Sequence, residues 1–475
     1  MNDHETSRFS LTVTGLMGLL ICFFAMVFMK EITLPYLALP LVFLACGILL
    51  RRKGVSIPEI AMYLLVAYLP FSKKIGEEFG HFGSAFNFVN LLMAVFLLSW
   101  AWKGLKRRDW QWQSNALMIP MLLFVLIGVF SIASYRAYGA EYIKEASVQF
   151  LQTWIIPLVL FVLVFHTVRD RGAFKNIVLI MMFAVAVVSL LAVYEYQFNT
   201  GGGDIDEARV GILTDDPNLL GAFIVFYMFF PLAFIFMNWR RKVSWTMMVP
   251  FLISCRAVMV TFSRGAYLAL AVAVFAMAFF RKKWLFLILV FLAWFALANP
   301  YLLPGGIRYR MGQTVKTGTP DMANTEALEG SLDPSAGKRI EVWQAAGRMI
   351  RTHPVFGVGY ALFLPKVQHY WTFPFSMDAH NTYLLIAVEM GVPALGLFLW
   401  MLLVLFWNGR KVYRKTRDPF VKASALGFLG GLFSFLVCNF FVTHLHVPEV
   451  AAYFWVLAAL MMRSRIEVET QEIKK

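Results

Sequence analysis

Long apolar segments recur along almost the whole of this 475-residue chain, with short charged breaks between them. A helix that spans a bilayer needs about 20 consecutive apolar residues, and many of these segments are about 17 to 20 residues long. The composition agrees, because 60% of the residues are hydrophobic and only 15% are charged, whereas soluble domains have roughly 45–50% apolar residues. The sequence therefore predicts an all-α, polytopic integral membrane helix bundle.

The apolar segments predict about fourteen transmembrane helices. They lie near residues 10–29, 32–50, 55–71, 85–102, 116–133, 151–167, 176–194, 218–238, 245–262, 265–280, 284–299, 381–407, 420–442 and 449–462. The first follows a short polar start and has no small-residue cleavage pattern behind it, so we expect it to be a retained anchor.

The net charge of +15 would suggest a nucleic-acid partner in a soluble protein, but here the basic residues mark the topology. Lys and Arg gather at alternate breaks, at 51–53, 106–108, 169–171, 240–242, 281–283, 410–417 and in the tail. Cytoplasmic loops carry this excess, so these breaks and both termini are predicted to be cytoplasmic. Membrane lipids are expected partners and nucleic acid is not. The four cysteines fall within apolar spans, so paired disulfides outside the membrane are not expected.

Three segments on the opposite, outer side are longer or more polar than tight turns: residues 198–217, the turn at 263–265, and the stretch 300–380. Function is expected there. The long stretch contains a predicted helix at 336–352, whose apolar face would be Ile340, Trp343, Ala346 or Gly347, and Ile350. Such a helix would lie on the membrane surface or on the helical bundle. We find no metal-ligand cluster, phosphate-binding loop or dinucleotide fingerprint, so no cofactor is expected.

Two outer arginines are candidates for binding phosphate. Arg209 precedes the outer start of a predicted helix, where it could aim at an anion. The equally weighted alternative is a solvated arginine paired with a carboxylate at 204, 206 or 207. Arg264 lies between two apolar spans with almost no loop, and a charge at that depth needs an anionic partner unless it snorkels to the interface. Arg256 is deeper, and we expect it to pair with the buried Glu389.

His380 is the candidate base. It ends the long outer stretch where the chain enters a membrane helix, and an interfacial histidine can accept a proton near neutral pH. Taken alone, such a residue is more often a capping or packing histidine. The histidines at 353, 369, 444 and 446 compete for the role, and the pair at 444 and 446 lacks further metal ligands.

In their order, these pieces resemble the O-antigen ligase and O-antigen polymerase family of polytopic membrane glycosyltransferases. The motifs are Arg-Val-Gly at 209–211 with Pro-Asn at 217–218, Ser-Arg-Gly-Ala at 263–266, and a long outer loop that ends in His-Asn at 380–381. The similarity extends over roughly residues 193–401. It divides the chain into N-terminal transmembrane helices at 1–175 and a ligase-like catalytic membrane region at 176–475, which includes the 300–380 periplasmic loop.

The resemblance implies a glycan donor on undecaprenyl pyrophosphate at the outer face of a bacterial inner membrane. Arg209 and Arg264 would stabilise the pyrophosphate without a metal, His380 would activate the hydroxyl of a glycan or lipid acceptor, and transfer would invert the anomeric centre. Arg339 could bind a sugar or second phosphate, or could be a plain exposed arginine. These expectations fit lipopolysaccharide or exopolysaccharide biosynthesis.

Two alternatives remain open from the sequence. Protein O-oligosaccharyltransferases share this arrangement of motifs, and a polymerase or ligase is slightly favoured only because no appended soluble domain is evident. From another class, a polysaccharide or lipid transporter or flippase would also be polytopic and basic. Arg256 and Glu389, as charges within predicted spans, are the features that keep transport open.

Overall fold

The computed structural model describes residues 13–24, 33–73, 88–107, 112–198, 209–211, 216–299, 301, 334–371 and 377–473. All regular structure in these ranges is helical, which confirms the all-α prediction. The main helices are α2 (Thr33–Arg52), α3 (Ile57–Tyr68), α5 (Phe88–Arg107), α6 (Met118–Ser134), α7 (Ala140–Phe150), α8 (Ile156–Thr167), α9 (Arg171–Phe198), α10 (Pro217–Tyr227), α11 (Phe229–Met237), α12 (Met248–Val260), α13 (Arg264–Arg281), α14 (Lys283–Ala298), α17 (Pro334–Thr352), α18 (Phe363–Val367), α19 (Thr382–Met390), α20 (Val392–Lys415), α21 (Pro419–Cys438) and α22 (Pro448–Ile473).

Seven helical stretches in the described ranges are long and apolar enough to cross a membrane. They are Phe88–Lys106, Ala140–Thr167, Arg171–Phe198, Pro217–Met237, Arg264–Arg281, Val392–Lys415 and Pro419–Cys438. Five shorter apolar helices fall at further predicted segments. The protein is therefore a polytopic helical membrane protein, and the number fourteen stays a prediction.

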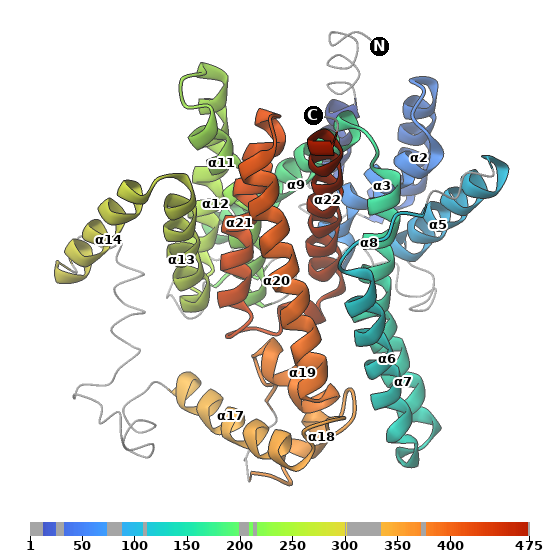
Figure 1. The fold of residues 1–475 in the computed structure, drawn as a ribbon, viewed down its shortest axis with the longest axis vertical. Coiled ribbons are helices and arrows are strands. Elements are labelled where there is room, and N and C mark those ends of the chain that lie inside the picture. The colour runs from blue at the N-terminus through green and yellow to red at the C-terminus, as the bar shows by residue number, and fades with distance from the viewer. Residues whose placement is uncertain are drawn as a thin grey trace.

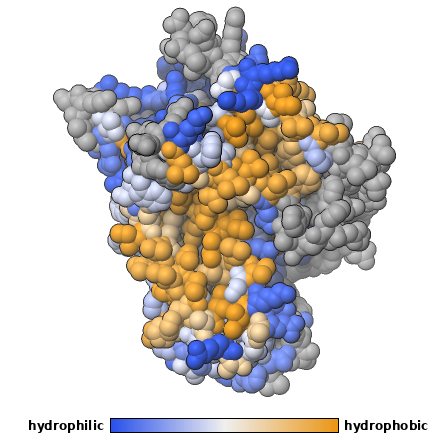
Figure 2. Space-filling view, turned by 90° about the vertical axis from the view of Figure 1, so that its right-hand side faces the viewer, coloured by the Kyte–Doolittle hydropathy of each residue, from blue (hydrophilic) through white to orange (hydrophobic). Residues whose placement is uncertain are grey.

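The helices form an upright bundle around α22 (Figure 1). Every residue of α22 from Ala451 to Met462 is buried, because α8, α20 and other helices surround it. A helix that is apolar on all sides is stable only in such a central position or in lipid. Figure 2 shows hydrophobic side chains over the middle of one face, with hydrophilic residues above and below. A band of this kind is the surface that a bilayer covers.

The single helix predicted at 381–407 is wrong, because the chain reverses at Gly391. Gly391 has φ +89°, and a Cβ there would lie 2.1 Å from the carbonyl oxygen of Val355. The rings of Tyr383 and Phe398 are 6.2 Å apart, whereas fifteen residues of one continuous helix would separate them by about 22 Å. Helices α19 and α20 are therefore an antiparallel hairpin, and α19 is not among the candidate membrane spans.

Helices α17, α18 and α19 form a second, smaller core at the lower end of Figure 1. The predicted loop helix is confirmed as α17, and it packs on α19. Its predicted apolar face was wrong in most positions: the buried residues are Val342, Ala345, Ala346 and Met349. The pattern misled because Ile340, Trp343 and Ile350 are only half-buried, at the edges of this stripe.

The hairpin of α6 and α7 is hydrogen-bonded to this second core. Ser131 donates to the carbonyl oxygen of Glu389 at 2.7 Å, and Tyr135 donates to that of Gly357 at 3.0 Å. Tyr142 donates to the carbonyl oxygen of Tyr360 at 2.9 Å. These bonds link residues more than two hundred positions apart. Helix α6, which falls at the predicted span 116–133, and helix α7, which the sequence did not predict, therefore help to position the segment that leads to His380.

Candidate active site

Arg209 joins the end of α12 to the start of α10. Its Nε donates to the Thr261 carbonyl oxygen at 3.3 Å, and its Nη2 donates to Asn218 Oδ1 at 3.1 Å. Asp216 caps α10 and holds Asn218 in turn, because its Oδ1 accepts from the backbone N–H of Asn218 at 2.7 Å and from Nδ2 at 3.1 Å. The guanidinium is thereby oriented by two helices. The alternative carboxylate partners of Arg209, at 204, 206 and 207, lie outside the described residues.

Arg264 lies at the same end of the bundle as Arg209. It is the first residue of α13, three positions after Thr261, and the side chain of Ser263 caps this helix. A Cβ on Gly221 of α10 would lie only 3.0 Å from Thr261 Oγ1. The starts of α10 and α13 are therefore in direct contact, and the half-buried Arg264 belongs to the cluster that holds Arg209.

The chain segment before α19 is anchored to three neighbouring elements. Trp343 of α17 donates from Nε1 to the carbonyl oxygen of Ala379 at 2.8 Å. Thr443 donates to Asp378 Oδ2 at 2.7 Å, and the backbone N–H of residue 382 donates to the carbonyl oxygen of Asn439 at 2.9 Å. His380 lies within this segment, so the backbone around it is held by α17 and by the residues that follow α21.

His380 does not cap α19. The cap is Asn381, whose Oδ1 accepts from the backbone N–H of Leu384 at 3.0 Å. Burial lowers the pKa of the His380 imidazole from its usual 6.5, and the positive charge of Arg339 lowers the pKa further. The negative charges of Asp378 and Asp216 raise the pKa of His380, but by less. The helix that begins at Arg264 approaches the same anchor as this segment: a Cβ on Gly265 would lie 3.1 Å from the Cβ of Phe441, and Thr382 donates to the carbonyl oxygens of Asn439 and Val442.

The backbone is strained on both sides of this neighbourhood. His380 has φ 45°, and Phe262, two residues before Arg264, has φ 49°. Among the described residues only one other non-glycine residue, Ala361, has a positive φ. Such conformations cost about 1–3 kcal/mol each and gather at functional sites. This observation agrees with a site where the starts of α10 and α13 approach residues 439–442, which hold the start of α19.

The expected pair of Arg256 and Glu389 is not formed. The Arg256 guanidinium lies 5.3 Å from the ring of Tyr196 on α9. Glu389 is buried in the second core, where its Oε1 accepts from the backbone N–H of Phe363 at 3.3 Å. The prediction was wrong because it treated 381–407 as one membrane helix, whereas the reversal at Gly391 places the carboxyl beside α18.

Of the competing histidines whose side chains the structure describes, His353 and His369 lie elsewhere, whereas the backbone N–H of His446 donates to Thr443, which binds Asp378 in the segment of His380. His353 hydrogen-bonds Thr352 at the end of α17, with Nδ1 and Oγ1 3.0 Å apart. His369 Nδ1 lies 3.3 Å from the carbonyl oxygen of Lys366, and the half-buried His446 has its ring 6.3 Å from that of Trp154. In the described part of the chain, no three His, Cys, Asp or Glu side chains form a group that could hold a metal ion.

Residues 249–399 match the family model described as O-antigen ligase, which confirms the resemblance of the chain to that family. The match includes Arg264, Arg339 and His380, while Arg209 lies before it. The family and the apolar helices support an inner-membrane protein with a glycosyltransferase-like activity. Among curated proteins, none matches the chain.

The residues that support the cluster were mostly absent from the sequence-based site. Asn218 entered the sequence analysis only as part of the Pro-Asn motif at 217–218, yet its side chain binds Arg209. Trp343 was assigned to an apolar face, and its indole N–H instead holds the backbone before His380. For Asn218, the available signal was the Asp-Pro-Asn sequence at a helix start. The role of Trp343 depends on a contact between residues 36 positions apart, which no local signal indicates.

Proposed function

We propose that this protein transfers or polymerises a glycan linked to undecaprenyl pyrophosphate onto an acceptor hydroxyl at the outer face of the inner membrane. The observation that carries the proposal is the grouping of Arg209, Arg264 and His380 at one end of the helical bundle: the starts of α10 and α13 are in contact, and the starts of α13 and α19 both contact residues 439–442. The match to the O-antigen ligase family supports the same reading.

The two arginines are suited to the leaving group. Cleavage of the bond between the anomeric carbon and the phosphate oxygen leaves a pyrophosphate that gains negative charge. Guanidinium groups bind phosphate oxygens in a bidentate manner, and preorganised cations stabilise such charge in the transition state. Arg209 is already oriented by Thr261 and Asn218, so little reorganisation is needed when the donor binds. Arg264 at the start of α13 adds a second cation and the helix dipole.

His380 is suited to activating the acceptor. A neutral imidazole accepts the proton as the acceptor oxygen forms its bond to the anomeric carbon, opposite the departing pyrophosphate, so the configuration inverts. The lowered pKa of His380 keeps the ring neutral at neutral pH. Arg339, whose charge contributes to that lowering, is proposed to bind a sugar or a second phosphate.

The acceptor is proposed to be a glycan or lipid, as in a polysaccharide polymerase or ligase, with a protein hydroxyl as the second candidate. Transport loses one of the two features that kept it open, because Glu389 lies on α19, which is not among the candidate membrane spans, while Arg256 remains within the apolar helix α12.

A direct assay uses the purified full-length protein in micelles with a synthetic polyprenyl-pyrophosphate oligosaccharide and several hydroxyl acceptors. We expect transfer without added nucleotide, release of polyprenyl pyrophosphate and an inverted anomeric linkage by NMR. Arg264→Ala should abolish transfer, while Arg351→Ala, an exposed arginine at the end of α17, should not. Full transfer by a well-folded Arg264→Ala protein would refute the phosphate role.

The orientation is tested by cysteine labelling in intact spheroplasts. Thr352→Cys and Arg240→Cys are compared in a Cys22→Ser background; the two positions lie in α17 and in the basic break after α11. A membrane-impermeant maleimide should label position 352 from outside and position 240 only after permeabilisation. The reverse pattern would overturn the topology.

A further inference from the structure

An apolar groove lies between α13, α14, α20 and α21, away from the candidate active site. Its volume is about 780 Å³, which is within the roughly 300–1,000 Å³ of small-molecule sites. The rings of Phe280, Phe406 and Phe433 pack against one another with centroids 6.0–6.1 Å apart. Phe275 and Phe286 continue this surface onto α14. The groove therefore offers an aromatic surface to a long apolar chain.

One end of the groove is basic. Lys283, Arg410 and Arg414 are among its lining residues, and no lining residue is acidic. The Arg410 guanidinium lies 5.3 Å from the ring of Trp407, which also lines the groove. All three cations lie at helix ends of the same side: Lys283 begins α14, and the two arginines are in the last turns of α20. The groove thus combines an apolar body with a cationic mouth.

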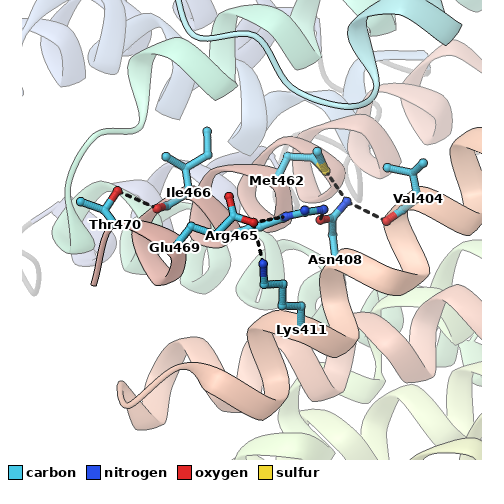
Figure 3. A network of polar contacts seen from close by, with 8 residues as sticks. All are labelled: Val404, Asn408, Lys411, Met462, Arg465, Ile466, Glu469 and Thr470. Carbon is cyan, nitrogen blue, oxygen red and sulfur yellow. Dashed lines mark hydrogen bonds and ion pairs between the residues drawn. The ribbon is translucent and has the colours of Figure 1, made fainter. Parts of the chain in front are cut away.

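A neighbouring face of α20 shows how this protein neutralises a half-buried cation that contacts another helix. Lys411 donates to Glu469 Oε1 at 2.6 Å, and Arg465 donates to the same oxygen at 2.9 Å (Figure 3). Arg410 and Arg414 are four residues apart and share a different face of the helix. Within the described residues, neither has a carboxylate within ion-pair distance. Their charge is available to a ligand.

We propose that this groove binds an anionic phospholipid, with its phosphate on Arg410, Arg414 and Lys283 and an acyl chain along the phenylalanine rings. Basic pockets between membrane helices recognise acidic lipid head groups in this way. A free phosphate would leave the apolar surface uncovered, and a neutral lipid would leave the cations without a partner. The proposed orientation puts this end in the cytoplasmic leaflet; the binding itself does not depend on that assignment.

The lipid would also fill a gap in the helix packing. Helix α14 projects away from the bundle and packs against α13 (Figure 1), and Phe279 and Trp407 are about half exposed at the groove, with 49% and 51% of their surface accessible. A bound chain would contact α14 on one side and α20 on the other. Ligands that bind the folded state stabilise it by mass action, so lipid binding should raise the unfolding temperature.

The test is native mass spectrometry and thermal unfolding of the full-length protein in micelles with equal amounts of phosphatidylglycerol and phosphatidylcholine. We expect the wild-type protein to retain phosphatidylglycerol preferentially and to gain thermal stability from it. The double variant Arg410→Gln/Arg414→Gln should bind that lipid about thirtyfold more weakly, since each cation near a membrane surface contributes roughly 1 kcal/mol to attraction of anionic lipid.

A matched control removes the same charge elsewhere. Arg240→Gln/Arg241→Gln neutralises two exposed arginines of another basic break and should bind like the wild type. Ala276→Phe narrows the groove without changing its charge and should also lose the lipid. Equal retention of both lipids, undiminished binding by the double variant, or equal losses in the control would overturn the proposal. Displacement of phosphatidylglycerol by undecaprenyl phosphate at equal concentration would overturn the assignment to a phospholipid.

Discussion

Replacing Glu389 by glutamine is expected to remove a large pH dependence of folding stability. Glu389 lies in the second core, outside the candidate membrane spans, and burial raises the pKa of its carboxyl from 4.5 to about 8. In the unfolded chain the carboxyl titrates near its ordinary value. Between these two pH values the folded protein retains a proton that the unfolded chain has released, so the free energy of unfolding falls as pH rises.

The size of this pH dependence follows from the pKa values of Glu389 in the folded protein and in the unfolded chain. A separation of about 3.5 pH units, at about 1.4 kcal/mol per unit, corresponds to about 5 kcal/mol. This stability is fully present below about pH 4.5 and is lost as pH rises through about 8. Glutamine has almost the same shape and keeps an oxygen that can accept from the backbone N–H of Phe363, but it does not ionise.

The assay is thermal unfolding of the full-length protein in micelles from pH 5 to 9. The melting temperature of the wild type should fall across this range, while that of Glu389→Gln should stay nearly level and exceed the wild type at pH 9. Glu141→Gln, at an exposed position on α7, should follow the wild type. Parallel curves for the wild type and Glu389→Gln would refute the reasoning. Glycan transfer should survive in Glu389→Gln, whereas a proton-coupled transporter that used this acid would lose its activity.

Three further substitutions test the packing of the site. Arg209→Lys keeps the charge but loses the fork that bonds two helices, so transfer should fall about tenfold or more at normal protein levels. Trp343→Phe removes one indole hydrogen bond to the segment before α19; we expect about 1 kcal/mol lower stability and a lower transfer rate with unchanged donor binding. Gly391→Ala would place a Cβ 2.1 Å from the carbonyl oxygen of Val355 at a positive φ and should unfold at a much lower temperature, whereas Gly396→Ala, with open space around it, should not. Normal transfer by Arg209→Lys would contradict the role of the guanidinium fork. Weakened donor binding in Trp343→Phe would contradict a role limited to positioning the segment before α19, and equal melting temperatures of the two glycine variants would contradict the close approach at Gly391.

The helical membrane class could be predicted because it depends on local hydrophobicity alone. The loop helix α17 was predicted for the same reason, from composition and capping within a single segment. The reversal of the chain at Gly391 was not predicted, because Val392-Pro393 continues an apolar run that was interpreted as one helix. What breaks it is the approach of the Val355 carbonyl group, a contact between segments that hydropathy does not encode.

The candidate active site was also predictable only in part. The sequence order of its motifs predicted Arg209, Arg264 and His380 as a set, and the structure brings their segments to one end of the bundle. The residues that support them, Asn218 and Trp343, form hydrogen bonds between a helix and a non-helical segment, and no periodicity in the sequence reveals such bonds. The buried Glu389 was misread for the same reason, since its location depended on the fold of α19.

The most direct test of the central claim is the transfer rate across pH for the wild type, His380→Gln and His380→Ala, with His353→Ala as the control. If His380 is the base, the wild-type rate is level near neutral pH and falls on acidification through a pKa below 6.5, because burial and Arg339 lower that pKa. His380→Ala should lose about 10²–10⁴-fold in rate while it still folds and binds the donor, and His353→Ala should remain close to the wild type. A glutamine variant with near-wild-type activity would reduce His380 to orienting the acceptor, and full activity in His380→Ala would contradict its role in the reaction.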